Sequence, residues 1–187
     1  MSNFDVAAMR IPEVKLIVPR RFHDDRGFLS EVFSHHKLRD LGVRMDVVQE
    51  NFSHSVAAGT VRGLHFQIDP APQGKLVRVT RGSVLDVAVD LRHGSPTFGA
   101  HASATLTAAG GEMFFVPVGF AHGFCTLEPA TEVTYLLSAP HDPAAERGIV
   151  WNDSTLGIEW PVAHDAAIIS DRDRALPPFD GLPVFFT

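Results

Sequence analysis

The sequence predicts an all-β protein whose short antiparallel strands close into a barrel or pack as a sandwich. Short apolar runs rich in Val, Phe, Thr and Leu recur along the 187-residue chain, and Gly, Pro, Asp or Ser bounds each run. The run Ser83–Asp90 partly alternates, as expected for a strand with one buried face and one functional face. Many short strands separated by turn signals favour a closed or sandwiched antiparallel sheet.

The strands are assigned from β-branched and aromatic residues, which pack well on a pleated surface. In chain order they are Val14–Pro19, Gly27–Phe33, Lys75–Thr80, Ser83–Asp90, Ala100–Leu106, Met113–Pro117, Gly123–Leu127 and Glu132–Ser138. Ser34–Leu41 is the one helix expected in the first half, and a short helical or irregular stretch is expected near Ala163–Ser170. Barrels of this kind bind ligands in their mouth or interior, so polar residues in otherwise apolar strands are the functional candidates.

Length and charge limit the possible functions. A single domain over residues 1–187 is expected, because one β-sandwich can take up a chain of this size. The net charge of −6 gives no broad basic face, so a nucleic-acid partner is not expected. A small anionic ligand is still compatible, because local Arg and Lys clusters can outweigh the net charge.

The single cysteine, Cys125, excludes an intramolecular disulfide and a Cys-rich metal site. The N-terminal residues lack a basic start followed by a long apolar run, which argues against a secretory signal. No uninterrupted apolar stretch approaches the length of a membrane span. A cytoplasmic location without a membrane partner is therefore expected.

Two motifs bring histidines onto the predicted barrel. Residues 111–122 read G-x5-P-x-G-x2-H and end at His122, and residues 59–82 read G-x5-H-x-Q-x7-K-x6-G, with His65, Gln67 and Lys75. They resemble the two cupin motifs, which implies a cupin-type jelly-roll barrel or sandwich with a few short helices. Metal-binding cupins carry a second His and a Glu where Gln67 and Lys75 stand. Gln is a poor ligand and Lys repels a cation, so neither a metal nor another cofactor is expected.

Several segments in the same order and spacing resemble the dTDP-4-dehydrorhamnose 3,5-epimerase family. They are DDRGFLSEVF, GTVRGLHFQ, KLVRVTRGSVLDVAVDLRHGSPTFG, FVPVGFAHGF, ERGIVWND and SDRD, and the resemblance runs from about Val14 to about Pro178. It implies epimerisation of dTDP-4-keto-6-deoxy-D-glucose at carbons 3 and 5, in dTDP-L-rhamnose biosynthesis. It also implies a homodimer in which an N-terminal strand crosses to the partner.

The chemistry explains why such residues are needed. Inverting a carbon beside a ketone requires a base on one face, an acid on the other, and charge stabilisation at the ketone oxygen. Imidazole changes charge near neutral pH, so His65 is a natural base. The resemblance gives His65 that role, with Asp173 holding its tautomer, Lys75 facing the keto oxygen and Tyr135 as the acid. Asp171 is a rival for the place of Asp173.

The resemblance also implies a set of contacts with the sugar nucleotide: Arg26, Glu31, Gln49, Asn51, Arg62, His122, Glu146 and Arg172. The arginines suit the diphosphate, because guanidinium can hydrogen-bond phosphate oxygens in pairs. For His122, a purely structural hydrogen bond is an equal alternative. Pro140 and His141 stand where the family often carries an aromatic pair near the nucleobase, so stacking on the base is weaker here or comes from elsewhere.

The sequence is compatible with three other functions. A 3- or 5-monoepimerase acting on a related nucleotide 4-keto-6-deoxysugar would use the same residues. A metal-dependent cupin would contain metal, which analysis of the pure protein would detect. A non-catalytic sugar-binding cupin would bind its ligand without turnover, although binding alone does not need an acid and a base on opposite faces.

Overall fold

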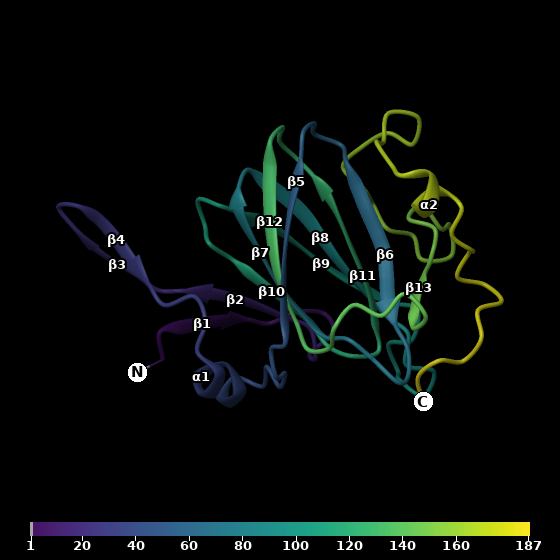
Figure 1. The fold of residues 1–187 in the computed structure, drawn as a ribbon, viewed down its shortest axis with the longest axis horizontal. Helices are drawn as coiled ribbons and strands as arrows, with labels where there is room; N and C mark the ends of the chain where they lie inside the picture. Colours follow the sequence, from purple (N-terminus) through teal and green to yellow (C-terminus); the bar gives the residue numbers. More distant parts are fainter. Residues whose placement is uncertain (1) are drawn as a thin grey trace.

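Two antiparallel sheets pack face to face in the computed structural model, which describes residues 2–187 (Figure 1). In sheet order, the six-stranded sheet contains β1 (Phe4–Ala7), β2 (Lys15–Pro19), β10 (Met113–Val116), β7 (Lys75–Arg81), β12 (Thr131–Leu137) and β5 (Gln49–Ser55). The five-stranded sheet contains β13 (Glu146–Gly148), β6 (Val61–Gln67), β11 (Phe120–Thr126), β8 (Ser83–Asp90) and β9 (His101–Thr107). The all-β, cupin-type sandwich expected from the sequence is confirmed.

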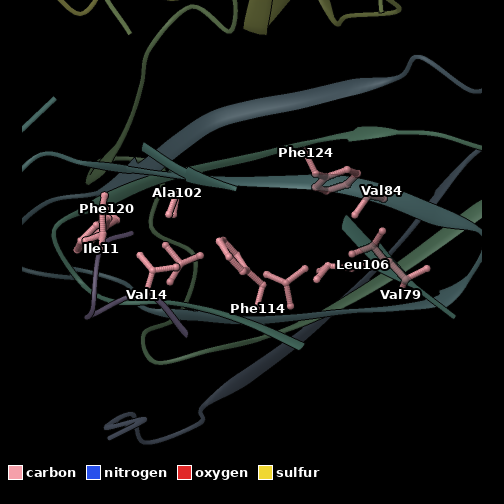
Figure 2. Packing of buried hydrophobic residues seen from close by; sticks show 13 residues of the cluster. Ile11, Val14, Val79, Val84, Ala102, Leu106, Phe114, Phe120 and Phe124 are labelled. Carbon is pink, nitrogen blue, oxygen red and sulfur yellow. The ribbon is translucent and has the colours of Figure 1, made fainter. Parts of the chain in front are cut away.

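The core lies between the two sheets, and each sheet contributes alternate residues of its strands (Figure 2). Val77 and Phe114 come from the six-stranded sheet, and Ala88, Phe120 and Phe124 come from the five-stranded one. A fully buried Phe or Val contributes about 1.5–3 kcal/mol relative to an exposed one. This layer therefore fixes which side chains of each strand point inward.

The five-stranded sheet is buried on both faces, which differs from the single buried face expected for Ser83–Asp90. Val87 and Val89 of β8 point away from the sandwich interior and pack with Phe179 and Phe185 near the C-terminus. The C-terminal segment thus covers the outer face of this sheet, and the inner face carries the polar residues.

The predicted strands are present, and only two of them differ from the prediction by more than one residue at either end. The segment predicted as Gly27–Phe33 ends as a strand at Ser30, in β4 (Gly27–Ser30). The strand predicted from Gly123 already begins at Phe120, and its register shifts between His122 and Phe124. Five strands, β1, β3 (Arg21–Asp24), β5, β6 and β13, were not predicted.

The helix expected at Ser34–Leu41 is confirmed as α1 (His35–Asp40), which Ser34 precedes as N-cap. The stretch 163–170 is irregular, and a second short helix, α2 (Asp171–Arg174), follows it directly. Within residues 2–187, no helix is long and apolar enough to cross a membrane.

Candidate active site

A cavity of about 510 Å³ opens between the two sheets, with residues 168–173 on one side. Its walls carry seven of the twelve residues that the sequence analysis selected: Arg62, His65, Lys75, His122, Tyr135, Arg172 and Asp173. They come from four strands and from α2, so the fold assembles them from segments more than 100 residues apart. The cavity is therefore the candidate active site.

His65 and Asp173 form a hydrogen-bonded pair on one wall. Asp173 Oδ1 lies 2.8 Å from His65 Nε2. The second oxygen, Oδ2, accepts the backbone N–H of Gly63 at 3.1 Å, and Ser170 caps α2 by accepting the N–H of Asp173. The rival carboxylate, Asp171, is exposed at the start of the same helix. The geometry thus selects Asp173 as the partner of His65.

The pair has the charge distribution of a base with an orienting carboxylate. Burial on its own would raise the pKa of Asp173, but the hydrogen bonds from His65 and Gly63 outweigh burial, and the pKa is lowered. An ionised Asp173 accepts the Nε2–H of neutral His65, which leaves Nδ1 of the imidazole as the proton acceptor. The ring is half-buried, with 26% of the side chain exposed, so it remains accessible to a bound molecule.

Tyr135 lies on the opposite wall of the cavity. It belongs to β12 of the six-stranded sheet, whereas His65 belongs to β6 of the five-stranded sheet. Its ring packs at the edge of the core, and its side chain lines the cavity. A phenol group is therefore free to donate into the cavity from the side that faces the imidazole.

Lys75 places a cation between these walls. It starts β7, next to β12, and its side chain is only 8% exposed, with Nζ donating to the backbone carbonyl of His65 at 3.3 Å. Burial lowers the pKa of Lys75 to about 8, although Asp86 and Glu146 act in the opposite direction through their charges. A cation held in a water-poor site stabilises a developing oxyanion far better than one in water.

His122 forms a second imidazole–carboxylate pair beside the first. Its Cα is the direct partner of the His65 Cα in the β6–β11 ladder, and its Nε2 lies 2.8 Å from Asp86 Oδ1. His122 is 6% exposed and Asp86 is fully buried. Burial lowers the pKa of His122, against the raising effect of Asp86, which favours the neutral ring. Asp86 was not among the residues selected from the sequence.

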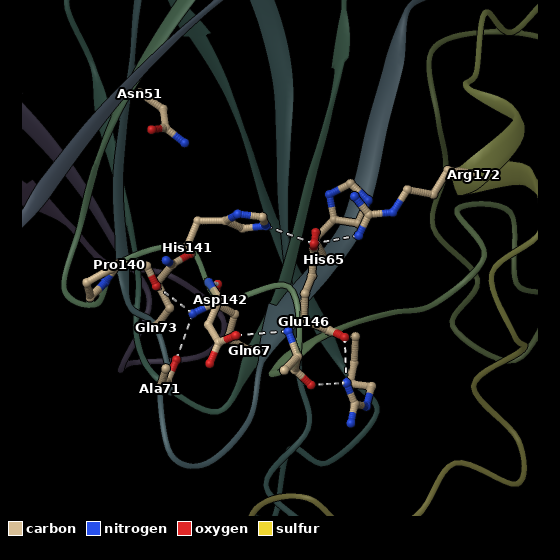
Figure 3. A network of polar contacts seen from close by, with 12 residues as sticks. Asn51, His65, Gln67, Ala71, Gln73, Pro140, His141, Asp142, Glu146 and Arg172 are labelled. Atoms are coloured by element: carbon tan, nitrogen blue, oxygen red, sulfur yellow. Dashed lines mark hydrogen bonds and ion pairs between the residues drawn. The ribbon is translucent and has the colours of Figure 1, made fainter.

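The rim of the cavity carries a chain of charged groups (Figure 3). The Glu146 carboxylate lies 2.9 Å from His141 Nε2 and 2.5 Å from the Arg172 guanidinium. Burial would raise the pKa of Glu146, but these two partners outweigh burial and lower it. On the other side, Arg62 reaches from β6 to the backbone carbonyl of His54 in β5. Two guanidinium groups therefore border one opening.

Gln49 and Asn51 lie next to Tyr135 rather than among the residues that line the cavity. Both belong to the edge strand β5, where Asn51 is the direct partner of Tyr135. Gln49 donates to the Asn51 side chain at 2.7 Å and accepts the backbone N–H of His141 at 3.0 Å. They extend the polar surface from the acid wall toward the rim.

Two residues expected to contact a substrate are not at the cavity of the single chain. Arg26 lies in the β3–β4 hairpin, which pairs only with itself and projects from the sandwich (Figure 1). Its side chain is 90% exposed and pairs with Asp24. Glu31 binds Lys37 and Asn3 beside α1. One chain therefore does not bring these two residues to its own cavity, and their contacts with a substrate stay a prediction.

The residues at the cupin metal positions do not fit a divalent cation. The Gln67 amide is fully hydrogen-bonded to backbone groups, because Nε2 donates to the Ala71 and Pro140 carbonyls and Oε1 accepts the N–H of Asp142 (Figure 3). Lys75 adds a positive charge at the next position. Across residues 2–187, no three His, Cys, Asp or Glu side chains are grouped to hold a metal.

A cupin-type sandwich with an imidazole and a phenol on opposite walls of one cavity, and a buried amine beside them, contains the groups that acid/base epimerisation requires. Comparison with known proteins identifies the family. The profile of the family described as dTDP-4-dehydrorhamnose 3,5-epimerase matches residues 8–181. The chain belongs to this family.

Individual relatives are similar in sequence and structure over nearly the whole chain. The dTDP-4-dehydrorhamnose 3,5-epimerase of Sinorhizobium fredii is 48% identical over 179 residues, which cover 96% of this chain and 91% of the relative. The same enzyme from Bacillus anthracis, solved with TDP and PPi bound, has a TM-score of 0.90 at 45% identity and covers 94% of this chain and 99% of that one. The dTDP-6-deoxy-D-glucose-3,5-epimerase of Legionella pneumophila, in complex with dTDP-4-keto-L-rhamnose, has a TM-score of 0.90 at 37% identity and covers 96% and 95%.

Proposed function

We propose that this chain epimerises dTDP-4-keto-6-deoxy-D-glucose at carbons 3 and 5, the step that leads toward dTDP-L-rhamnose. The observation that carries the proposal is the position of His65 and Tyr135 on facing sheets of one cavity. A planar enolate held between them exposes one face to the base and the other to the acid. A cytoplasmic location and a single domain over residues 1–187 are part of the same proposal.

The reaction runs through one enolate at each carbon. Nδ1 of His65 takes the proton from the carbon beside the ketone, and the electron pair moves onto the ketone oxygen. The Lys75 ammonium stabilises this oxyanion, and Asp173 stabilises the imidazolium. Tyr135 then delivers its proton to the opposite face of the same carbon, which inverts the centre. The phenolate and imidazolium return to their starting states by proton exchange with water.

Substrate binding is assigned to the groups around the opening. Arg62 and Arg172 border the cavity and suit the diphosphate, because a guanidinium forms paired hydrogen bonds with phosphate oxygens. Binding at Arg172 would compete with its ion pair to Glu146, so the Glu146 carboxylate is placed to turn toward a sugar hydroxyl. His122 faces the cavity and offers its second ring nitrogen to the sugar.

The direct test follows the sugar protons by NMR in deuterated water after addition of dTDP-4-keto-6-deoxy-D-glucose. Deuterium incorporation with inversion at both carbons is the expected result. Inversion at only one carbon would make the protein a monoepimerase that uses the same residues. A folded sample that exchanges neither carbon would overturn the proposal.

We also infer that the protein works as a homodimer in which the β3–β4 hairpin carries Arg26 to the partner's cavity. The hairpin exposes Phe22 (52%), Phe28 (55%) and Leu29 (75%), and a two-stranded hairpin is at best marginally stable by itself. Apolar side chains gathered on a projecting element are typical of an interaction surface. The crossing would bring Arg26 to the diphosphate that the single chain leaves out of its reach.

Complementation tests this crossing. His65→Ala and Arg26→Ala should each reduce turnover strongly, and mixing the two chains under exchange conditions should restore activity. A mixed dimer then contains one cavity with both intact residues, so recovery approaches about a quarter of the parent activity when half of the dimers are mixed. If Arg26 served its own chain, no mixed dimer would contain an intact cavity and no activity would return. Light scattering would show the dimer directly.

A further inference from the structure

We propose that Asp86 is a positioning residue of the epimerase: from beneath the cavity, its carboxylate orients the His122 ring and stabilises the ammonium charge of Lys75. The inference rests on the proposed function above. Asp86 does not line the cavity and is fully buried, so it acts through its neighbours rather than on the sugar.

The alternation of side chains along β8 points Asp86 into the interior between the two sheets, where the cavity lies. On β8 it lies between Val84 and Ala88, and all three point into the sandwich, where these two pack in the same core cluster as Val77. Lys75 lies two residues before Val77 on the inward face of the opposing sheet. The Asp86 carboxylate therefore enters the interior from one sheet and the Lys75 ammonium from the other.

Asp86 uses only one of its oxygens in the protein. Oδ1 accepts from His122 Nε2 at 2.8 Å, whereas Oδ2 has no hydrogen-bond partner among residues 2–187, although it is buried. A buried carboxylate oxygen without a donor costs about 1–3 kcal/mol or more, so it requires a compensating role. A nearby buried cation supplies one, because opposite charges attract more strongly away from water.

The position of His122 excludes the other obvious role, that of a second acid. Its Cα pairs directly with that of His65 in neighbouring strands, so both rings approach the cavity from the same sheet. A proton delivered from there would return to the face that His65 deprotonates, and the carbon would not invert. His122 thus suits a fixed hydrogen bond, and its Nε2–H bond to Asp86 determines which nitrogen faces the cavity.

The charges around Lys75 single out Asp86. The titratable groups that face it from the packed elements are His65, Asp86, His122, Tyr135 and Glu146, with Arg172 and Asp173 from α2, while β10 contributes none. Asp86 and Glu146 are the two carboxylates that act to raise the pKa of Lys75 against burial, and the effect of Asp86 is the larger. Glu146 is already neutralised at the rim by Arg172.

The test measures the charge of Lys75 directly. The chain has only three lysines, Lys15, Lys37 and Lys75, so NMR of protein with ¹³Cε-labelled lysine gives three signals, and Lys75→Met assigns one of them. In the parent protein this signal should titrate near pH 8. In Asp86→Asn its midpoint should fall by about one pH unit or more, since a lost opposite charge at close range has this effect.

Two variants act as controls. Asp90→Asn removes an equally buried carboxylate four residues along β8, and it should leave the Lys75 midpoint where it is. Glu146→Gln should lower the midpoint by less than Asp86→Asn. If Asp86→Asn does not fold, Asp86→Ser provides a smaller neutral replacement that can still hydrogen-bond His122. A Lys75 midpoint that stays unchanged in the folded variant overturns the inference.

Turnover separates this inference from the proposed function. In Asp86→Asn, the limb of the kcat profile at high pH should move to lower pH by the same amount as the Lys75 signal, because only the charged amine stabilises the oxyanion. KM should change less than kcat. A parent protein without turnover would refute the proposed function, while the lysine titration would still decide whether Asp86 controls Lys75.

Discussion

Replacing Asp173 by Asn should damage the reaction more than the loss of one hydrogen bond suggests. The two carboxylate oxygens accept from two donors, the Gly63 backbone N–H at 3.1 Å and His65 Nε2 at 2.8 Å. An amide has only one acceptor oxygen. If this oxygen stays with Gly63, the amide N–H₂ faces His65 and selects the tautomer protonated on Nδ1, which cannot accept the proton from the sugar.

The size of the decrease in kcat follows from two costs of the substitution. Turning the amide to suit His65 leaves the buried Gly63 N–H facing another donor, at a cost of about 1–3 kcal/mol. The charge-assisted bond that stabilises the imidazolium is also lost, at about 1.5–3 kcal/mol. Together these raise the barrier by about 2.5–6 kcal/mol, which corresponds to a decrease in kcat of about 10²- to 10⁴-fold.

The assay is steady-state turnover, with deuterium exchange as a second readout of proton abstraction. Asp171→Asn is the matched control, because it makes the same change on an exposed residue of the same helix and should keep kcat within about two-fold of the parent. A folded Asp173→Asn protein that keeps more than about a tenth of the parent kcat would show that the carboxylate does not set the tautomer of His65.

Three further outcomes are expected. Tyr135→Phe keeps the ring and should leave the melting temperature nearly unchanged. The rate of inversion should fall by about 10²- to 10⁴-fold, while exchange of the proton that faces His65 persists. Loss of this exchange as well would contradict the assignment of His65 and Tyr135 to opposite faces of the sugar. At Asp90, burial would raise the pKa, but hydrogen bonds led by Arg92 lower it to about 2. An acid with a lowered pKa stabilises the folded state at pH values above its pKa in the unfolded chain, 3.8, and this contribution is lost as the pH falls toward 2. Asp90→Asn should therefore destabilise the protein by about 2 kcal/mol at pH 7 and by little at pH 2. Denaturant unfolding at the two pH values measures the difference. Gly63→Ala should lower stability by about 2–4 kcal/mol, because φ is +129° there and an added Cβ would lie 2.5 Å from the Gly123 Cα; a melting temperature equal to that of the parent would refute this packing.

The sequence predicted the strands with a clear apolar pattern and missed strands such as β5 and β6, where polar residues interrupt it. Met113–Val116 is uniformly apolar and Lys75–Arg81 nearly so, and both were found. β5 reads QENFSHS, where inward polar residues such as Asn51 alternate with exposed ones, so no apolar period marks it. β6 carries Arg62 and His65, which both line the cavity, and its sequence was interpreted as a motif instead of as a strand.

Prediction of the candidate site from the sequence succeeded where a motif marks the residue and failed where only the tertiary structure shows its neighbours. His65, Lys75 and Tyr135 could be selected because motifs and resemblance mark them, and the fold does bring them to one cavity. Arg26 was expected at the cavity, but the β3–β4 hairpin holds it away from the cavity of its own chain, and no local pattern in the sequence indicates that direction. Asp86 had a visible signal, an acidic residue inside the apolar run Ser83–Asp90, but its partner could be known only once β8 lay beside β11.

The two imidazole–carboxylate pairs show how burial separates the roles of chemically identical groups. His65 and His122 are neighbours in one ladder, and each has Nε2 at 2.8 Å from an aspartate oxygen. His65 keeps 26% of its side chain exposed, so a charge formed there by proton abstraction remains partly solvated and paired with Asp173. His122 is 6% exposed, and burial lowers its pKa beside the Lys75 cation, so charging it would place two positive groups together away from water. In the proposed mechanism, the same hydrogen bond therefore supports a base at one position and a neutral, oriented ring at the other, and interchanging these roles would require a different distribution of buried charge.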